Sequence, residues 1–213
     1  MLKSVRVPEA FRPPFEKAES YVEKLFSEMV MTPSEGAIRI GQQRYVLMRC
    51  ESLYLSWFDA LAETFGAETA REFIYNTARE IGRSDAADFC KRLGVTDGVE
   101  RLSAGPVHFA HAGWAIVDLL PDCVPAMDAN YFLHYRHPNT FESEVIRSRK
   151  QKVDKPACLF SAGYSAGWCS EAFKIEVHAR EIQCTGRGDP SCEFIMAAAE
   201  KLDAHELQLL RQR

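Results

Sequence analysis

The chain has 213 residues, of which 46% are hydrophobic and 26% charged, and its formal net charge is −4. This size and composition fit one sizeable globular domain or two closely packed halves. The acidic balance argues against direct nucleic-acid binding, because domains that read DNA are usually basic. No apolar run reaches the roughly 18–20 residues that span a bilayer, and the N-terminus lacks the apolar core of a secretory signal. We therefore expect a cytoplasmic protein without a membrane partner.

The first half of the chain is predicted to be mainly helical, because apolar residues recur there at helical spacing. The elements expected in it are an extended arm at 1–14, helices at 15–29, 45–65 and 67–81, a further segment at 84–93, and a short strand at 37–40. We assign residues 1–34 to an N-terminal arm and helix, which is a candidate element for dimerisation.

The second half mixes helices and strands. Its expected elements are a helix at 97–112, strands at 114–120 and 130–135, a short helix ending near 149, a helix at 156–173, and hairpin strands at 175–183 and 192–196. A last helix begins near Asp203, and we assign 199–213 to a C-terminal linker helix. This order predicts an α+β fold, with helices around a small, mainly antiparallel sheet and a C-terminal helix–hairpin.

The predicted hairpin holds a group of potential metal ligands. Cys184 and Cys192 bracket a tight Gly/Asp/Pro turn, and Glu181 precedes Cys184 by three residues. Two nearby thiols and a carboxylate are most of a structural zinc site. Cys158, in the first turn of the preceding helix, is the natural fourth ligand, because the helix dipole favours a thiolate there. The spacing alone also allows a surface glutamate and buried cysteines without metal, since Glu181 and Cys184 point to opposite faces of an ideal strand.

Two sequence runs carry a resemblance to a known family. They are ACLFSAGYSAGWC at 157–169 and REIQCTGRGDPSC at 180–192. Together they resemble the 4-vinyl reductase domain, in the version found in the N-terminal effector-sensing region of bacterial activators of aromatic (phenol and xylene) catabolism. Gly105-Pro106 and the run NTFESE at 139–144 resemble the preceding part of that region, so the resemblance covers roughly residues 35–196.

The resemblance implies a ligand-sensing domain at 35–198, usually dimeric, with an apolar pocket and a zinc-binding subdomain at 156–196. In that family three cysteines and a glutamate hold a structural Zn²⁺. The matching residues of this chain are Cys158, Glu181, Cys184 and Cys192.

The resemblance also suggests which residues line the ligand pocket. Carried over by position, they are His108, Phe109, Trp114, Tyr135, His137, Tyr164 and Trp168. The phenol sensors have a histidine just after Gly-Pro and a tryptophan on the following strand, where this chain has Phe109 and His137. The sequence thus predicts an effector other than simple phenol, with His137 or His108 as its polar partner. Without the resemblance, aromatic residues of this kind are more often ordinary core.

We therefore expect a signal-input domain that binds a small hydrophobic or aromatic molecule and controls an output domain or partner protein in transcription regulation or signalling. The sequence shows no Walker-type phosphate loop and no GxGxxG fingerprint, and four protein ligands would leave zinc no open position, so we expect no enzyme activity. The alternative is a carrier of a tetrapyrrole (a bacteriochlorophyll precursor) or a protein related to 4-vinyl reductases.

Overall fold

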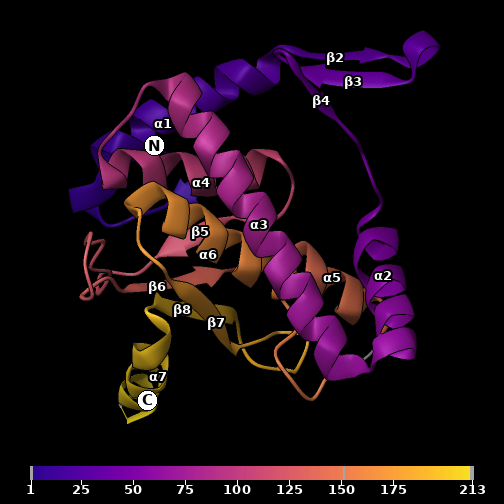
Figure 1. Cartoon of the computed structure of the whole chain (residues 1–213), viewed down its shortest axis with the longest axis vertical. Coiled ribbons are helices and arrows are strands. Elements are labelled where there is room, and N and C mark those ends of the chain that lie inside the picture. Colours follow the sequence, from indigo (N-terminus) through magenta and orange to yellow (C-terminus); the bar gives the residue numbers. More distant parts are fainter. Residues whose placement is uncertain (1, 151, 212–213) are drawn as a thin grey trace.

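Figure 1 shows the computed structural model of the chain, in which residues 2–150 and 152–211 are described. The helices are α1 (Arg12–Ser27), α2 (Cys50–Phe65), α3 (Ala67–Leu93), α4 (Gly98–His111), α5 (Phe141–Ser148), α6 (Leu159–Phe173) and α7 (Leu202–Arg211). The strands are β1 (Val5–Arg6), β2 (Met29–Thr32), β3 (Ala37–Ile40), β4 (Gln43–Tyr45), β5 (Val117–Leu119), β6 (Leu133–His137), β7 (His178–Gln183) and β8 (Cys192–Ala197). The predicted α+β fold is confirmed. Residue 1 of the predicted arm and residues 212–213 of the predicted linker helix lie outside the described residues.

The main sheet has the strand order β1-β5-β6-β8-β7, and all of its pairs are antiparallel except β1 with β5. One face of this sheet packs against α4 and α6, and α3 lies against α6 as a further layer (Figure 1). On the opposite face, Ile195 and Ala197 of β8 form a smaller apolar cluster with Leu202 of α7. The sheet therefore separates the main core from the C-terminal helix.

Glycines allow α3 and α6 to pack with their backbones in contact. A Cβ atom added to Gly167 would lie 1.9 Å from a backbone carbonyl oxygen of α3, and one added to Gly163 would lie 2.2 Å from another. From the other side, a Cβ atom on Gly82 would lie 2.2 Å from a carbonyl oxygen of α6. Real atoms cannot approach so closely, so any side chain at these positions would force the helices apart.

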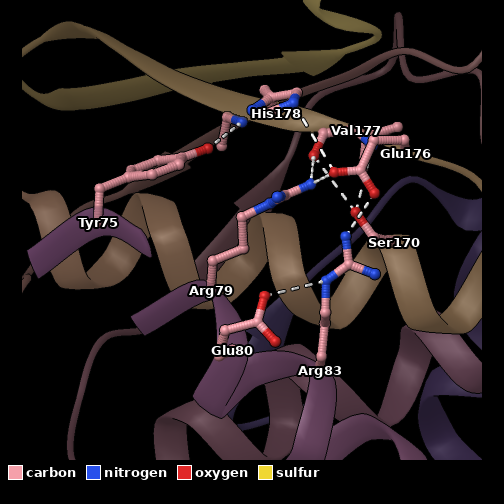
Figure 2. Close-up of polar contacts among 9 residues, drawn as sticks. Tyr75, Arg79, Glu80, Arg83, Ser170, Glu176, Val177 and His178 are labelled. Carbon is pink, nitrogen blue, oxygen red and sulfur yellow. Dashed lines mark hydrogen bonds and ion pairs between the residues drawn. The ribbon is translucent and has the colours of Figure 1, made fainter. Parts of the chain in front are cut away.

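A polar network joins α3 to the connection between α6 and β7 (Figure 2). Arg83 lies 2.5 Å from the Glu176 carboxylate, and Arg79 pairs with the same carboxylate. The Tyr75 hydroxyl accepts a hydrogen bond of 3.0 Å from the backbone N–H of Ala179 in β7. Because Glu176 is half exposed, these ion pairs position β7 more than they stabilise it.

The structure corrects the predicted start of the second helix. Residues 43–45 form β4, in which Tyr45 pairs with Ile38 of β3, and α2 begins only at Cys50. Likewise α1 ends at Ser27, because the residues from Met29 onward pair with β3. Apolar residues at helical spacing also suit strands, and here pairing with a neighbouring strand decides between the two.

Several further boundaries differ from prediction. Helix α1 begins at Arg12, within the predicted arm, and strands β5 and β7 begin at Val117 and His178, three residues later than expected. The segments expected at 67–81 and 84–93 form one continuous helix, α3, because Gly82 is buried against α6 and does not break it. Helix α6 begins at Leu159 rather than at 156, so Cys158 is its N-cap residue. Strand β6 covers Leu133–His137 rather than 130–135. Thr140 caps the start of α5, since its Oγ1 accepts a hydrogen bond of 3.1 Å from Ser143 N.

Strands β2, β3 and β4 form a separate antiparallel sheet that projects from the body of the molecule (Figure 1). It and the following segment carry exposed apolar side chains: Met29, Val30, Met31, Val46, Leu47 and Met48.

Among the described helices, none is both long enough and apolar enough to cross a membrane.

We predict that Gly167→Ala destabilises the protein by about 3 kcal/mol, because the added methyl group would overlap the backbone of α3. Urea unfolding followed by circular dichroism measures the loss. Asn76→Ala, at an exposed position of α3, is the control and should change stability by less than about 0.5 kcal/mol. Equal effects of the two substitutions would contradict the close helix contact.

Candidate functional site

Four ligand-type side chains converge below the C-terminal hairpin. Cys158, Glu181, Cys184 and Cys192 are all buried, and one ligand atom of each lies within 4.8 Å of those of the others. The sulfur atoms of Cys158 and Cys192 are 3.7 Å apart. Tetrahedral zinc with Zn–S bonds of about 2.3 Å would hold two sulfurs about 3.8 Å apart, so this spacing fits. Glu181 Oε1 is buried without a hydrogen-bond partner, which leaves a carboxylate oxygen available to a metal ion.

A β-bulge brings Glu181 and Cys184 to the same point. Glu181 pairs with Phe194, whereas Gln183 pairs with Glu193, so one residue of β7 is left over between them. Such a bulge reverses the alternation of side chains, and β7 ends at Gln183. The bulge thus removes the conflict that the sequence indicated, in which Glu181 and Cys184 point to opposite faces of an ideal strand.

Helix α6 supplies the fourth group. Cys158 is the N-cap residue of α6, and its backbone N–H donates a hydrogen bond of 2.8 Å to Glu181 Oε2. The Gly/Asp/Pro turn closes the site from the other side, because Asp189 Oδ2 accepts a hydrogen bond of 2.8 Å from Cys184 N. In this turn Gly188 has a φ of +103°, a conformation that favours glycine.

The electrostatics of the cluster favour a cation. Hydrogen bonds from the Cys158 and Cys184 thiols lower the pKa of Cys192. Burial raises the pKa of Cys158 well above its usual value, and it raises the pKa of Glu181 to about 8. These groups cannot all ionise next to one another in a buried site, whereas a divalent ion would make their charged forms favourable.

The sequence did not single out Glu142, although it lies within the NTFESE run. Its Oε1 atom accepts hydrogen bonds from Phe160 N (2.7 Å) and Ser161 N (3.2 Å) at the start of α6. Burial raises the pKa of Glu142 to about 8. This carboxyl group satisfies the free N–H groups of the helix end next to Cys158.

An apolar cavity of about 30 Å³ lies between α4, α6 and the main sheet, and we call it the inner cavity. Its walls are Leu102, Gly105, Pro106, Phe109, Val117, Leu119, Leu133, Tyr135, Tyr164, Ser165, Trp168, Cys169 and Met196. Four residues predicted from the sequence, Phe109, Tyr135, Tyr164 and Trp168, are therefore brought together around it. No charged side chain is among its walls.

A larger pocket of about 260 Å³ lies between the projecting sheet and α4, and we call it the outer pocket. It is lined by Phe26, Met29, Ile38, Ile40, Tyr45, Val46, Leu47, Asp85, His108, Phe109, His111, Ala112, Trp114 and Tyr164. The predicted residues His108 and Trp114 face this pocket and not the inner cavity. Phe109 and Tyr164 belong to both sets of walls and separate the two spaces.

His137 lines neither space but lies directly behind Phe109. The ring centres of His137 and Phe109 are 5.5 Å apart, and Phe194 lies 4.5 Å away on another side. Both ring nitrogens of His137 are buried without a hydrogen-bond partner, and the Tyr135 hydroxyl is likewise unpaired. Burial lowers the pKa of His137 to about 3, so its imidazole is neutral at physiological pH.

Hydrogen bonds connect two of the predicted pocket residues, Tyr164 and His108, to α3. Tyr164 Oη donates a hydrogen bond of 2.9 Å to Asp85 Oδ2 and lies 3.1 Å from His108 Nδ1. Burial lowers the pKa of His108 to about 4. No sequence pattern pointed to Asp85, because its contact with Tyr164 depends on the packing of α3 against α6.

Comparison with known proteins identifies the regions that build this site. Residues 138–198 match the 4-vinyl reductase domain, and residues 24–121 match the family described as activator of aromatic catabolism. Each match covers less than half of the chain, so the chain is similar to both families over these segments. The segment at 138–198 contains all four candidate metal ligands, whereas the activator region contributes His108, Phe109 and Trp114. The inner cavity lies where the two regions pack together.

Two curated relatives align with most of this chain. The transcriptional regulatory protein XylR of Pseudomonas putida is 26% identical over 180 residues, which cover 84% of this chain and 32% of XylR. The phenol regulator MopR of Acinetobacter guillouiae is 25% identical over 174 residues, which cover 82% of this chain and 31% of MopR. The chain thus spans about a third of the length of these relatives.

A solved structure shares the fold of this chain. The crystal structure of the phenol-responsive sensory domain of the transcription activator PoxR with phenol superimposes with a TM-score of 0.75 at 22% identity. The alignment covers 96% of this chain and 98% of that domain.

We predict that the imidazoles of His108 and His137 stay neutral down to about pH 5, because burial lowers their pKa values to about 4 and about 3. In an unfolded chain histidine titrates near pH 6.5, so unfolding takes up a proton at each site below that pH. Stability should then fall with decreasing pH by up to about 1.4 kcal/mol per pH unit for each imidazole, until the folded pKa is reached.

An NMR titration of the histidine ring resonances checks this prediction. His134 is an internal control: burial opposes its protonation, but hydrogen bonds to Glu193 and Asp122 outweigh burial and raise its pKa. His134 should therefore become protonated at a higher pH than the other two. Protonation of His137 at pH 6 would contradict the prediction.

Proposed function

We propose that this chain is a sensory domain that binds a small aromatic effector and controls an output domain or partner protein in transcription regulation. The observation that carries the proposal is the inner cavity, an apolar space with four aromatic side chains among its walls and with unpaired polar atoms of His137 and Tyr135 in the same aromatic cluster. Such a combination is typical of small-molecule sites. The regulators XylR and MopR and the phenol-bound PoxR domain support the same function.

The effector is neutral. None of the residues around the inner cavity is charged, and burial keeps His137 in its neutral form. A neutral imidazole offers one donor and one acceptor, so it suits a hydroxyl or amino substituent. Apolar cavities of about 150 Å³ admit benzene, so an aromatic effector must push the walls of this smaller cavity apart. Phe109, which separates it from the outer pocket, is the side chain that would move.

His137 gives the site a preference that differs from that of the phenol sensors. Those sensors combine a histidine on the helix with a tryptophan on the strand, whereas this chain has Phe109 on α4 and His137 on β6. His137 lies behind Phe109, so an effector that displaces Phe109 would reach a polar partner on the sheet instead of on the helix. We propose an aromatic effector larger than phenol or differently substituted.

The four converging ligands hold a structural zinc ion. Three sulfurs and one carboxylate oxygen form a closed tetrahedral set, which supplies a cross-link rather than a catalytic centre. Cys158 ties the start of α6 to the hairpin, and Cys192 ties the start of β8 to the same point. Since α6 and β8 both wall the inner cavity, the ion would hold two of its walls in place.

The segments on either side of the sensing domain are assigned to dimerisation and to contact with an output domain or partner protein. We assign residues 1–34 to an arm and helix that support a homodimer, 35–198 to the sensing domain, with its zinc-binding part at 156–196, and 199–213 to the linker. The exposed apolar residues of the projecting sheet fit burial against a second copy. In α7, Leu207 and Leu210 are both 55% exposed, which suits contact with an output domain or partner protein.

Metal analysis tests the zinc site. We expect about one zinc per chain in the purified protein. Cys184→Ser should lose both the zinc and cooperative folding, because the ion contributes to stability. Cys50→Ser is the matched control, since Cys50 is exposed and lies in α2. Purified wild-type protein that contains no zinc and still folds stably would rule the site out.

Ligand-dependent thermal stability tests the effector site. We expect aromatic compounds with a hydroxyl group to raise the melting temperature, with a gain of about 2.7 kcal/mol at a concentration 100 times Kd. His137→Phe should weaken their binding roughly tenfold, as one hydrogen bond is lost, and leave binding of toluene unchanged. Stabilisation by a tetrapyrrole but by no single-ring compound would favour the alternative function, a pigment carrier.

A further inference from the structure

We propose that the outer pocket is a second ligand site, separate from the inner cavity, which binds a neutral aromatic molecule carrying an O–H or N–H group. His108 Nε2 is the acceptor that recognises this group. The proposal goes beyond effector binding in the inner cavity, because His108 and the projecting sheet take no part in that cavity.

The hydrogen bonds among His108, Tyr164 and Asp85 determine which ring nitrogen of His108 carries the proton. The Tyr164 hydroxyl has one hydrogen, which it donates to Asp85 Oδ2 at 2.9 Å. In the hydrogen bond of 3.1 Å between Tyr164 Oη and His108 Nδ1, the donor must then be His108 Nδ1–H. In a neutral imidazole only one nitrogen is protonated, so Nε2 is left with a free lone pair.

This lone pair is unsatisfied. Nε2 is buried and has no hydrogen-bond partner, and the side chain of His108 lies on the wall of the outer pocket. A buried acceptor without a donor is unfavourable, so a ligand that brings an O–H or N–H group is favoured over one without. Neighbouring residues on a helix point about 100° apart, which explains why His108 faces only the outer pocket while Phe109 also reaches the inner cavity.

The rest of the pocket selects an aromatic, non-anionic molecule. Phe26, Tyr45 and Trp114 contribute rings, and the projecting sheet contributes aliphatic side chains. The Phe26 ring lies 5.8 Å from that of His108, so the acceptor sits beside an aromatic surface. Asp85 is the one acidic residue on the wall and no lysine or arginine is among the lining residues, which disfavours carboxylates. About 260 Å³ is ample for one substituted ring, since about 150 Å³ admits benzene.

The direct test follows the His108 Nε2 resonance by NMR in the full chain with ¹⁵N-labelled histidine rings, assigned with His108→Gln. Without ligand, Nε2 should show the signature of an unprotonated acceptor. Phenol and aniline should shift it saturably, whereas toluene, which has no donor, and benzoate, which is anionic, should not. A protonated Nε2 in the free protein, or equal shifts with toluene, would overturn the proposal.

A pair of cavity-filling variants separates the two spaces. Ala112→Phe fills the outer pocket from an exposed position of its wall, and Cys169→Met fills the inner cavity from α6. We expect Ala112→Phe to abolish the phenol-induced shift and Cys169→Met to preserve it. Val46→Trp, at a highly exposed position on the opposite wall of the outer pocket, repeats the first result if Ala112→Phe folds poorly. A shift that survives in Ala112→Phe and Val46→Trp but disappears in Cys169→Met would place the ligand in the inner cavity and refute the second site.

Discussion

The close contact between α3 and α6 is the constraint on which the rest of the structure depends. It requires glycine at positions 82, 163 and 167, where a Cβ atom would overlap the opposite backbone. With its glycines turned toward α3, α6 directs Trp168 and Cys169 to the inner cavity. The same contact brings Asp85 of α3 to the Tyr164 hydroxyl, and it holds the N-cap residue Cys158 beside the hairpin.

Strand β8 connects the three functional parts of the molecule. It begins at Cys192 in the candidate metal site, and Met196 lies on the wall of the inner cavity. Because side chains alternate along a strand, Ile195 and Ala197 point to the other face and pack near Leu202 of α7. A ligand that displaces the cavity wall would therefore act on a strand whose opposite face supports the C-terminal helix. If the proposed sensory function holds, this is a short physical route from effector to output.

In the proposed ligand sites, buried polar groups would give the aromatic cluster its chemical selectivity. His108 and His137 are separated by Phe109, and each has at least one ring nitrogen without a partner. Since burial keeps both imidazoles neutral, they can recognise hydroxyl or amino groups but offer little to anions. His108 faces only the outer pocket, whereas Phe109 and Tyr164 line both spaces, so the two proposed ligand sites would share these two walls.

The sequence by itself determined the α+β order of elements, the helix with Gly105-Pro106, the C-terminal hairpin, and the set Cys158, Glu181, Cys184 and Cys192, which does come together. The order of elements and the hairpin follow from local periodicity and turn residues, whereas the ligand set follows from ligand chemistry together with the family resemblance. Only the tertiary structure decided that a bulge in β7 aligns Glu181 with Cys184, that residues 43–45 join a sheet instead of a helix, and that the predicted pocket residues divide between two spaces. These outcomes depend on strand pairing and helix packing between segments far apart in the chain, and no local pattern records such contacts.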